Sequence, residues 1–209
     1  MPNWYHNTLK VEEGKAKEIF NFVASPERAF DFHKVVPMPE ELDIAESTTG
    51  SEGEAALYGQ NIEEVLEWIR HKGKGIDTQE KLLEYLKSKE CPYTEEALSL
   101  GEKYHSNRKK YGFPTWYEWR YHNWGTKWNA VEVVKKVNET GEEVLHFDTA
   151  NGVPLPILEK VSKQFPEATI CLYINSIDSM CEGFVKWKNG EVLEDEYREL
   201  NYEEVFSTP

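Results

Sequence analysis

The sequence predicts an α+β fold, and three observations support this. Apolar and polar residues alternate near both ends of the chain, which is typical of half-buried strands. Between residues 61 and 125 the apolar residues recur at helical spacing instead. The strand and helix patterns follow one another in the order β-α-β, a block of helices, β-β-α-β and a final hairpin.

The chain begins with the pattern of a strand, a helix and a second strand. Residues 5–11 alternate between apolar and polar side chains, which predicts a strand. Residues 15–24 place their apolar side chains on one helical face, and Pro26 ends that helix. The segment FDFHKVVP, residues 30–37, predicts a short second strand that closes at Pro37.

A helical block follows. Residues 43–60 are rich in Ser, Thr, Gly and Glu and predict a surface loop. Capping residues and apolar stripes then predict helices over residues 61–71, 77–89 and 94–112. Residues 114–125 predict one further short helix that starts at a proline and stops at a glycine.

The last third of the chain returns to strands. The elements predicted there are strands at 128–137 and 143–149 around the turn NETGEE, a helix at 154–166, a strand at 168–175 and a hairpin at 181–192. The pair Asn189-Gly190 is a strong signal for the turn of that last hairpin.

Without the helical block, these elements form two β-α-β halves, as in the ferredoxin-like split βαβ arrangement. We therefore expect a single α+β domain at residues 1–209, built on a ferredoxin-like antiparallel sheet. The helical insertion is expected at residues 43–122, after the second strand.

The charge of the chain limits its partners. The 209 residues include 24 basic and 38 acidic side chains, a formal net charge of −14. Binding to phosphates needs clustered Lys and Arg, so we expect no direct nucleic-acid binding and no attraction to anionic membranes. The acidic tail at residues 191–204 suggests a mimic of a phosphate backbone that enters a basic groove of another protein. Solubility alone is the alternative explanation for the acidic charge.

The cysteines and the apolar runs predict a reducing compartment. Cys91, Cys171 and Cys181 are widely spaced and form no CxxC pair, so neither a disulfide framework nor a zinc site is expected. Reduced thiols fit the cytoplasm. No apolar run approaches the roughly 20 residues of a membrane helix, and no signal peptide is visible at the start.

Motifs for common reactions are missing from the sequence. There is no GxGxxG, GxxxxGK[ST], HExxH or GxSxG pattern, so phosphate cradles, zinc hydrolase sites and nucleophile elbows are unsupported. We therefore assign no catalytic residue and expect neither a cofactor nor a metal ion.

The segment YHNWGTKWNA, residues 121–130, carries the most information about a site. Four of the seven tryptophans lie between residues 116 and 128. One interpretation is a structural rim of core; the other is an aromatic pocket with a few polar groups, the usual composition of a small-ligand site. A similar Asn-Trp pair begins the first strand, and adjacency of the two segments would gather one patch. The candidate ligand-binding residues are Asn3, Trp4, Asn7, Asn123, Trp124, Thr126, Lys127, Trp128 and Asn129.

Four segments together resemble one known family. These are MPNWYHNTLKV, VVPMPEEL, YEWRYHNWGTKWNA and HFDTANGVPLPILEKVSKQFP, and in this order they resemble the YubB ferredoxin-like domain family of phage and plasmid proteins. The resemblance implies a ferredoxin-like core and a mobile-genetic-element setting in a bacterial host. It assigns no activity, so no catalytic residue can be transferred.

Two function hypotheses follow. The first is a non-enzymatic binding protein of a phage or other mobile genetic element, cytoplasmic in its host. It would act on a host protein with a basic groove, such as a defence component. The second is a nucleotide- or small-ligand-binding protein or enzyme that uses the Asn/Trp/Lys patch, with tryptophan stacking on a base and Lys127 on a phosphate.

Overall fold

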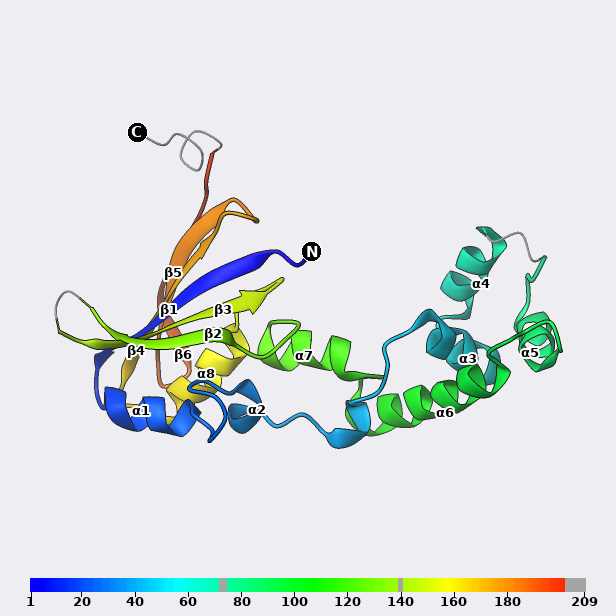
Figure 1. Cartoon of the computed structure of the whole chain (residues 1–209), viewed down its shortest axis with the longest axis horizontal. Helices are drawn as coiled ribbons and strands as arrows, with labels where there is room; N and C mark the ends of the chain where they lie inside the picture. Colours follow the sequence, from blue (N-terminus) through cyan, green and yellow to red (C-terminus); the bar gives the residue numbers. More distant parts are fainter. Residues whose placement is uncertain (72–74, 139–140, 202–209) are drawn as a thin grey trace. The chain divides into compact units, whose positions relative to one another are not determined.

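The computed structural model describes residues 1–71, 75–138 and 141–201 (Figure 1). The chain divides into two compact units. One contains Met1–Met38 and Arg120–Pro209, and we call it the sheet unit; the other contains Pro39–Trp119, and we call it the helical unit. The predicted insertion at 43–122 has different bounds, and its description as part of a single domain stays a prediction.

The sheet unit confirms the α+β class, because its centre is a six-stranded antiparallel sheet. The strand order is β2-β3-β1-β4-β5-β6, which places β1 and β4 in the middle and β2 and β6 at the edges. The strands are β1 (Trp4–Glu13), β2 (Val131–Val137), β3 (Glu143–Ala150), β4 (Thr169–Ser176), β5 (Cys181–Lys188) and β6 (Glu191–Glu199).

Helices cover one face of this sheet (Figure 1). They are α1 (Ala16–Val23), α2 (Phe32–Val35) and α8 (Leu155–Gln164). The helices bury apolar side chains against alternate residues of the central strands, which lowers the free energy of folding through the hydrophobic effect. Fully buried members of this core include Leu9, Ile19, Val23, Phe30, Phe32, Leu158, Ile170 and Leu172.

The predicted second strand at residues 30–37 is wrong, because Phe32–Val35 form helix α2. The Asp31 side chain accepts the backbone N–H of His33 at 3.0 Å and caps the helix. The Asn129 side chain accepts the N–H of Phe32 at 2.8 Å. These side chains satisfy the backbone groups that a strand would pair with a neighbour. The helical insertion was expected after a second strand. In the structure it follows α1 and α2, and the second strand of the sheet, β2, comes after it in the sequence.

The helical unit has its own apolar core, and five elements of its described residues lie wholly within this unit. They are η1 (Glu40–Leu42), α3 (Thr48–Tyr58), α4 (Ile62–His71), α5 (Gln79–Lys87) and α6 (Thr94–Tyr111). The predicted helices at 61–71, 77–89 and 94–112 are confirmed. Their buried side chains include Val65, Leu66, Ile69, Leu82, Leu86 and Ala97. Helix α7 (Trp116–Trp124) confirms the prediction at 114–125.

The predicted surface loop at residues 43–60 is wrong over most of its length, because it contains α3. Its glycines belong to a close contact between helices rather than to a loop. A Cβ atom on Gly53 would lie 1.8 Å from the Ala97 carbonyl oxygen of α6, so only glycine fits there. Ser47 caps the helix by accepting the N–H of Gly50 at 3.1 Å.

The remaining strand predictions are confirmed by the sheet, including the final hairpin. Asn189 and Gly190 both have positive φ values, 53° and 78°, as the predicted two-residue turn requires. The predicted turn at 138–143 includes residues 139–140, which lie outside the described residues. No helix of the described chain is both long and apolar enough to cross a membrane.

Candidate functional site

Three of the predicted ligand-binding residues are buried in the sheet unit. Asn7 is 2% exposed, and its Nδ2 donates to Thr149 Oγ1 at 3.0 Å. Trp124 is 2% exposed, and its Nε1 donates to the Val36 carbonyl at 2.9 Å. Thr126 is fully buried. These side chains hold the core together, which is the structural interpretation of the motif.

Two more predicted residues connect loops to elements. The backbone N–H of Asn3 donates to Asn151 Oδ1 at 2.8 Å, and its side chain donates to Ser179 Oγ at 3.3 Å. Asn129 Nδ2 donates to Asp31 Oδ1 at 2.7 Å. Asn123 lies on α7 and is partly exposed.

The last three predicted residues come together at one end of the sheet. The ring centroids of Trp4 and Trp128 are 6.1 Å apart. Lys127 Nζ lies 5.0 Å from the centroid of the Trp128 ring, a cation–π contact. The backbone N–H of Lys127 donates to the carbonyl of Ala150, which is paired with Trp4 in the sheet. Binding of a ligand by this cluster stays a prediction.

A hollow of about 590 Å³ opens beside Trp4, the one predicted residue that lines it. His6 and Asp148 also line it, and His6 Nδ1 lies 2.8 Å from Asp148 Oδ1. This pair was not predicted from the sequence. His6 and Asp148 meet because of the register between β1 and β3, and the alternation of residues within one strand does not reveal that register. The hollow's other charged residues, Glu132 and Asp178, are acidic.

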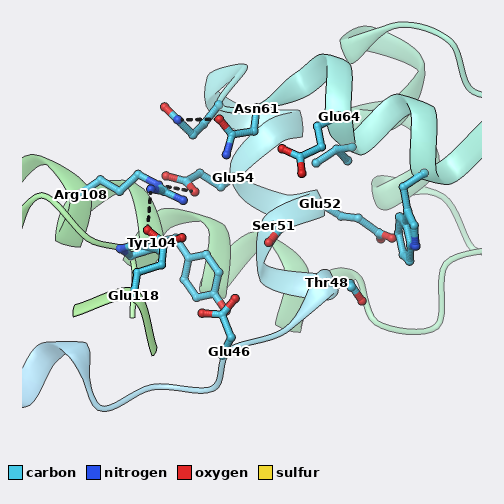
Figure 2. A pocket seen from close by; sticks show the side chains of 14 residues that line it. Glu46, Thr48, Ser51, Glu52, Glu54, Asn61, Glu64, Tyr104, Arg108 and Glu118 are labelled. Carbon is cyan, nitrogen blue, oxygen red and sulfur yellow. Dashed lines mark hydrogen bonds and ion pairs between the residues drawn. The ribbon is translucent and has the colours of Figure 1, made fainter. Parts of the chain in front are cut away.

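The helical unit contains a second cavity, of about 400 Å³, which we call the acidic pocket (Figure 2). Its charged lining consists of five carboxylates and one guanidinium, from Glu46, Glu52, Glu54, Glu64, Glu118 and Arg108. The side chains come mainly from α3, α4 and α6. At neutral pH this composition favours a positively charged occupant.

Glu54 is the most deeply buried charged residue of the acidic pocket, with 2% of its surface exposed. Arg108 Nε donates to Glu54 Oε2 at 3.1 Å, and Arg108 Nη1 lies 3.7 Å from Glu118 (Figure 2). Glu54 Oε1 is buried and has no hydrogen-bond partner in the described part of the chain. Burial raises the pKa of the Glu54 carboxyl, and the hydrogen bond and charge of Arg108 oppose this shift.

Aromatic residues complete the lining. Trp68 and Tyr104 both line the acidic pocket. The Tyr104 hydroxyl accepts the N–H of Ser47 at 3.0 Å and donates to the Ala45 carbonyl, so its ring is fixed at the start of α3. Tyr93 donates its hydroxyl to Glu52 Oε2 at 3.0 Å. The pocket therefore presents carboxylates and aromatic rings in defined orientations.

The acidic pocket was not predicted from the sequence either. Glu52 and Glu54 belong to a segment that its composition assigned to a loop, whereas they lie on α3. The sequence does contain a signal for the start of α3, because Ser47, a typical capping residue, stands directly before it. In the residues that the structure describes, no group of three or more His, Cys, Asp or Glu side chains is arranged to hold a metal ion.

A third acidic feature is the edge strand β6. It pairs with β5 on one side and ends the sheet, and all nine of its residues are exposed. It carries five acidic residues and one arginine. Lys186 binds Glu194 at 3.2 Å, and Arg198 binds Glu182, whereas Asp195 and Glu196 form no ion pair with the described residues.

Comparisons with known proteins give one distant structural neighbour. No family model matches the chain, and the curated proteins contain no significant match. Among solved structures, the chain is similar to a protein api92 from Yersinia pseudotuberculosis, described under the family model DUF1281, with a TM-score of 0.45 and 9% sequence identity. The match covers 96% of this chain and 99% of that protein.

Proposed function

We propose that this chain is a non-enzymatic binding protein whose edge strand β6 pairs with an extended basic segment of a partner protein. The single observation that carries the proposal is that β6 is exposed and acidic and that, among the residues that the structure describes, no strand pairs with its outer edge. Peptides that add a strand to such an edge gain main-chain hydrogen bonds, and their side chains provide specificity.

The composition of β6 supports pairing with a basic segment. Natural sheets usually protect an edge with lysine, proline or a bulge. The opposite edge, β2, has Lys135, Lys136 and a register shift after Val131. Strand β6 also has a register shift, opposite Lys186 and Trp187, but it contains no lysine, and its exposed apolar residues Leu193 and Tyr197 lie among carboxylates. These carboxylates repel an acidic strand, including a second copy of this chain, and attract Lys and Arg.

Asp195 and Glu196 are the acidic residues best placed for this contact. Successive residues of a strand point to opposite faces, so one carboxylate is offered on each face of β6. Lys or Arg side chains at consecutive positions of an added strand would reach one of them on each side. The same carboxylates would act as the phosphate mimic that the acidic tail suggested.

The setting of this function is part of the proposal. The resemblance of four segments to YubB-like proteins supports an origin in a phage or other mobile genetic element. A host protein with a basic groove, such as a defence component, is then the expected partner, and the host cytoplasm the expected location. We also propose a ferredoxin-like core for the sheet unit, supported by the order β2-β3-β1-β4 with α1 after β1 and α8 after β3.

The experiment uses the full chain and a peptide in which pairs of consecutive Lys residues are separated by Val and Thr. We expect saturable binding in a fluorescence anisotropy titration, with amide shifts confined to β5 and β6 in ¹H–¹⁵N spectra. Asp195→Asn with Glu196→Gln should weaken binding by about tenfold, since each exposed ion pair contributes up to about 1 kcal/mol. Glu95→Gln, an exposed change on α6, is the matched control.

Two results would contradict the proposal. A peptide with the same sequence but every backbone amide N-methylated cannot donate main-chain hydrogen bonds from either of its edges, so unchanged affinity for it would exclude strand addition. Equal affinity for a peptide in which Glu replaces Lys would exclude recognition of basic charge.

A second candidate function concerns the cluster of Trp4, Lys127 and Trp128. Their proximity supports stacking of a nucleotide base, with Lys127 near a phosphate. The carboxylates of Glu132, Asp148 and Asp178 in the adjacent hollow repel phosphate, and this ranks the candidate second. Tryptophan fluorescence titrated with a panel of nucleotides tests it, and a flat response rejects it.

A further inference from the structure

The acidic pocket leaves one buried carboxylate oxygen without a partner. An ionised carboxylate can accept about four hydrogen bonds through its two oxygens. Arg108 donates to Oε2 of Glu54 at 3.1 Å, whereas Oε1 has no donor among the residues that the structure describes. A buried acceptor without a partner is unfavourable, and a donor from a bound ligand would remove that penalty.

The charge of the lining specifies the kind of donor. Five carboxylates surround the cavity against the single guanidinium of Arg108, so a cation gains electrostatic energy there that a neutral donor does not. Of these carboxylates, Glu54 is almost completely enclosed by protein. A hydrogen bond between a cation and this carboxylate would be charge-assisted in a site of low dielectric constant.

The aromatic lining distinguishes among cations. Trp68 lines the pocket beside the carboxylates and is partly exposed, whereas Tyr104 is 1% exposed and offers no open ring face. A guanidinium is planar and weakly hydrated, and it stacks on aromatic faces while its edge donates to a carboxylate. An ammonium is more strongly hydrated and offers no plane to stack. The combination of an aromatic ring and carboxylates therefore favours a guanidinium.

We propose that the acidic pocket binds a guanidinium group, which donates a hydrogen bond to Glu54 Oε1 and stacks on Trp68. This site lies in the helical unit and is independent of the function proposed for β6. The guanidinium could belong to a free small molecule or to an arginine side chain, and the same chemistry serves both.

The test titrates the full chain with two guanidinium compounds, agmatine and N-acetyl-L-arginine amide, and follows ¹H–¹⁵N spectra. We expect both to shift amides of α3 and α6 around the acidic pocket. Tighter binding of agmatine identifies a free small molecule as the source, and tighter binding of the arginine amide identifies a protein side chain. N-acetyl-L-citrulline amide, which has the same shape without the charge, should cause no shifts.

Variants separate a binding site from a structural ion pair. Glu54→Gln should weaken agmatine binding by about tenfold or more, because the hydrogen-bond acceptor loses its negative charge. Glu95→Gln should bind as the wild type does. Trp68→Leu keeps every carboxylate and should also weaken binding, which keeps the test valid if Glu54→Gln fails to fold.

Three results would overturn the proposal: citrulline amide binding as tightly as the arginine amide, putrescine binding as tightly as agmatine, or unchanged affinity in both variants. The Asp195→Asn, Glu196→Gln variant of β6 should bind agmatine normally. Failure of the β6 proposal and failure of the pocket proposal therefore give different results.

Discussion

The Asn129 side chain accepts the backbone N–H of Phe32 through Oδ1 at 2.8 Å, although the two residues are 97 positions apart in the sequence. The same oxygen accepts the N–H of Ala130 at 2.9 Å, and Nδ2 donates to Asp31 at 2.7 Å. One amide group thus connects the first turn of α2 to the segment that leads into β2. This role accounts for an asparagine that the sequence suggested as a ligand contact.

Replacing Asn129 with Ala should destabilise the sheet unit by about 1–3 kcal/mol, because it leaves partly buried backbone and carboxylate groups without partners. Urea unfolding followed by circular dichroism measures the change. Asn21→Ala, an exposed asparagine on α1, is the matched control and should change stability by less than about 0.5 kcal/mol. Equal stability of the two variants would contradict this prediction, because it would mean that water replaces the hydrogen bonds of Asn129 at no cost in free energy.

Gly53→Ala should destabilise the helical unit by about 3 kcal/mol, because the new methyl group would overlap with the Ala97 carbonyl where α3 packs against α6. If the two helices were not in close contact, alanine would stabilise α3 relative to glycine. The sign of the change in unfolding free energy therefore shows whether the close contact exists. Unfolding by urea measures it, with Ser106→Ala on the exposed side of α6 as control. A stabilised Gly53→Ala variant would contradict the close packing of these helices.

The extent to which the sequence predicted the fold depends on the range of the interactions that determine each element. Strand β1 follows from local alternation, β4 follows from a continuous apolar run, and the turn at Asn189–Gly190 follows from the two residues themselves. Helix α2 is different, because its capping depends partly on Asn129, far away in the sequence. Helix α3 looked like a loop, because glycine is unfavourable in an isolated helix and is selected here by a neighbouring helix.

The same reasoning explains the site predictions. The motif around Trp124 identified residues that come together in space, yet composition alone could not separate a core tryptophan from a ligand contact. The acidic pocket combines Glu54 of α3 with Arg108 of α6, which are 54 positions apart in the sequence. No local pattern relates two such positions, so the pocket could be found only from the structure.

The pH dependence of stability should reveal the buried Glu54. Its pKa in the folded state is raised by burial above the usual value of 4.5, so below that value it is protonated in both states and contributes nothing. As the pH rises above 4.5, the unfolded chain loses the proton first, and the folded state becomes relatively less stable. The difference in unfolding free energy, wild type minus Glu54→Gln, should therefore fall as the pH rises.

Urea unfolding of both proteins over a series of pH values measures this difference. Glu95→Gln should show no such trend, because Glu95 is exposed on α6. A difference that instead increased with pH would mean that Arg108 more than compensates for burial and that the folded-state pKa of Glu54 lies below 4.5.

The opposite shift is expected at Glu41, which accepts a hydrogen bond from Lys110 Nζ at 2.8 Å. This bond, with smaller contributions from the Glu41 backbone and Tyr111, lowers the pKa of the Glu41 carboxyl to about 2. A lowered pKa stabilises the folded state above the unfolded value of 4.5, and that contribution is lost as the pH falls from 4.5 towards 2. Both side chains are more than half exposed, so the gain in stability should be small.

An NMR titration of the Glu41 carboxyl carbon measures the pKa directly. Lys110→Met should return it towards 4.5, whereas Lys109→Met, the neighbouring change on α6, should leave it low. If both variants left the pKa low, the shift would arise from the chain around Glu41 itself and not from the ion pair.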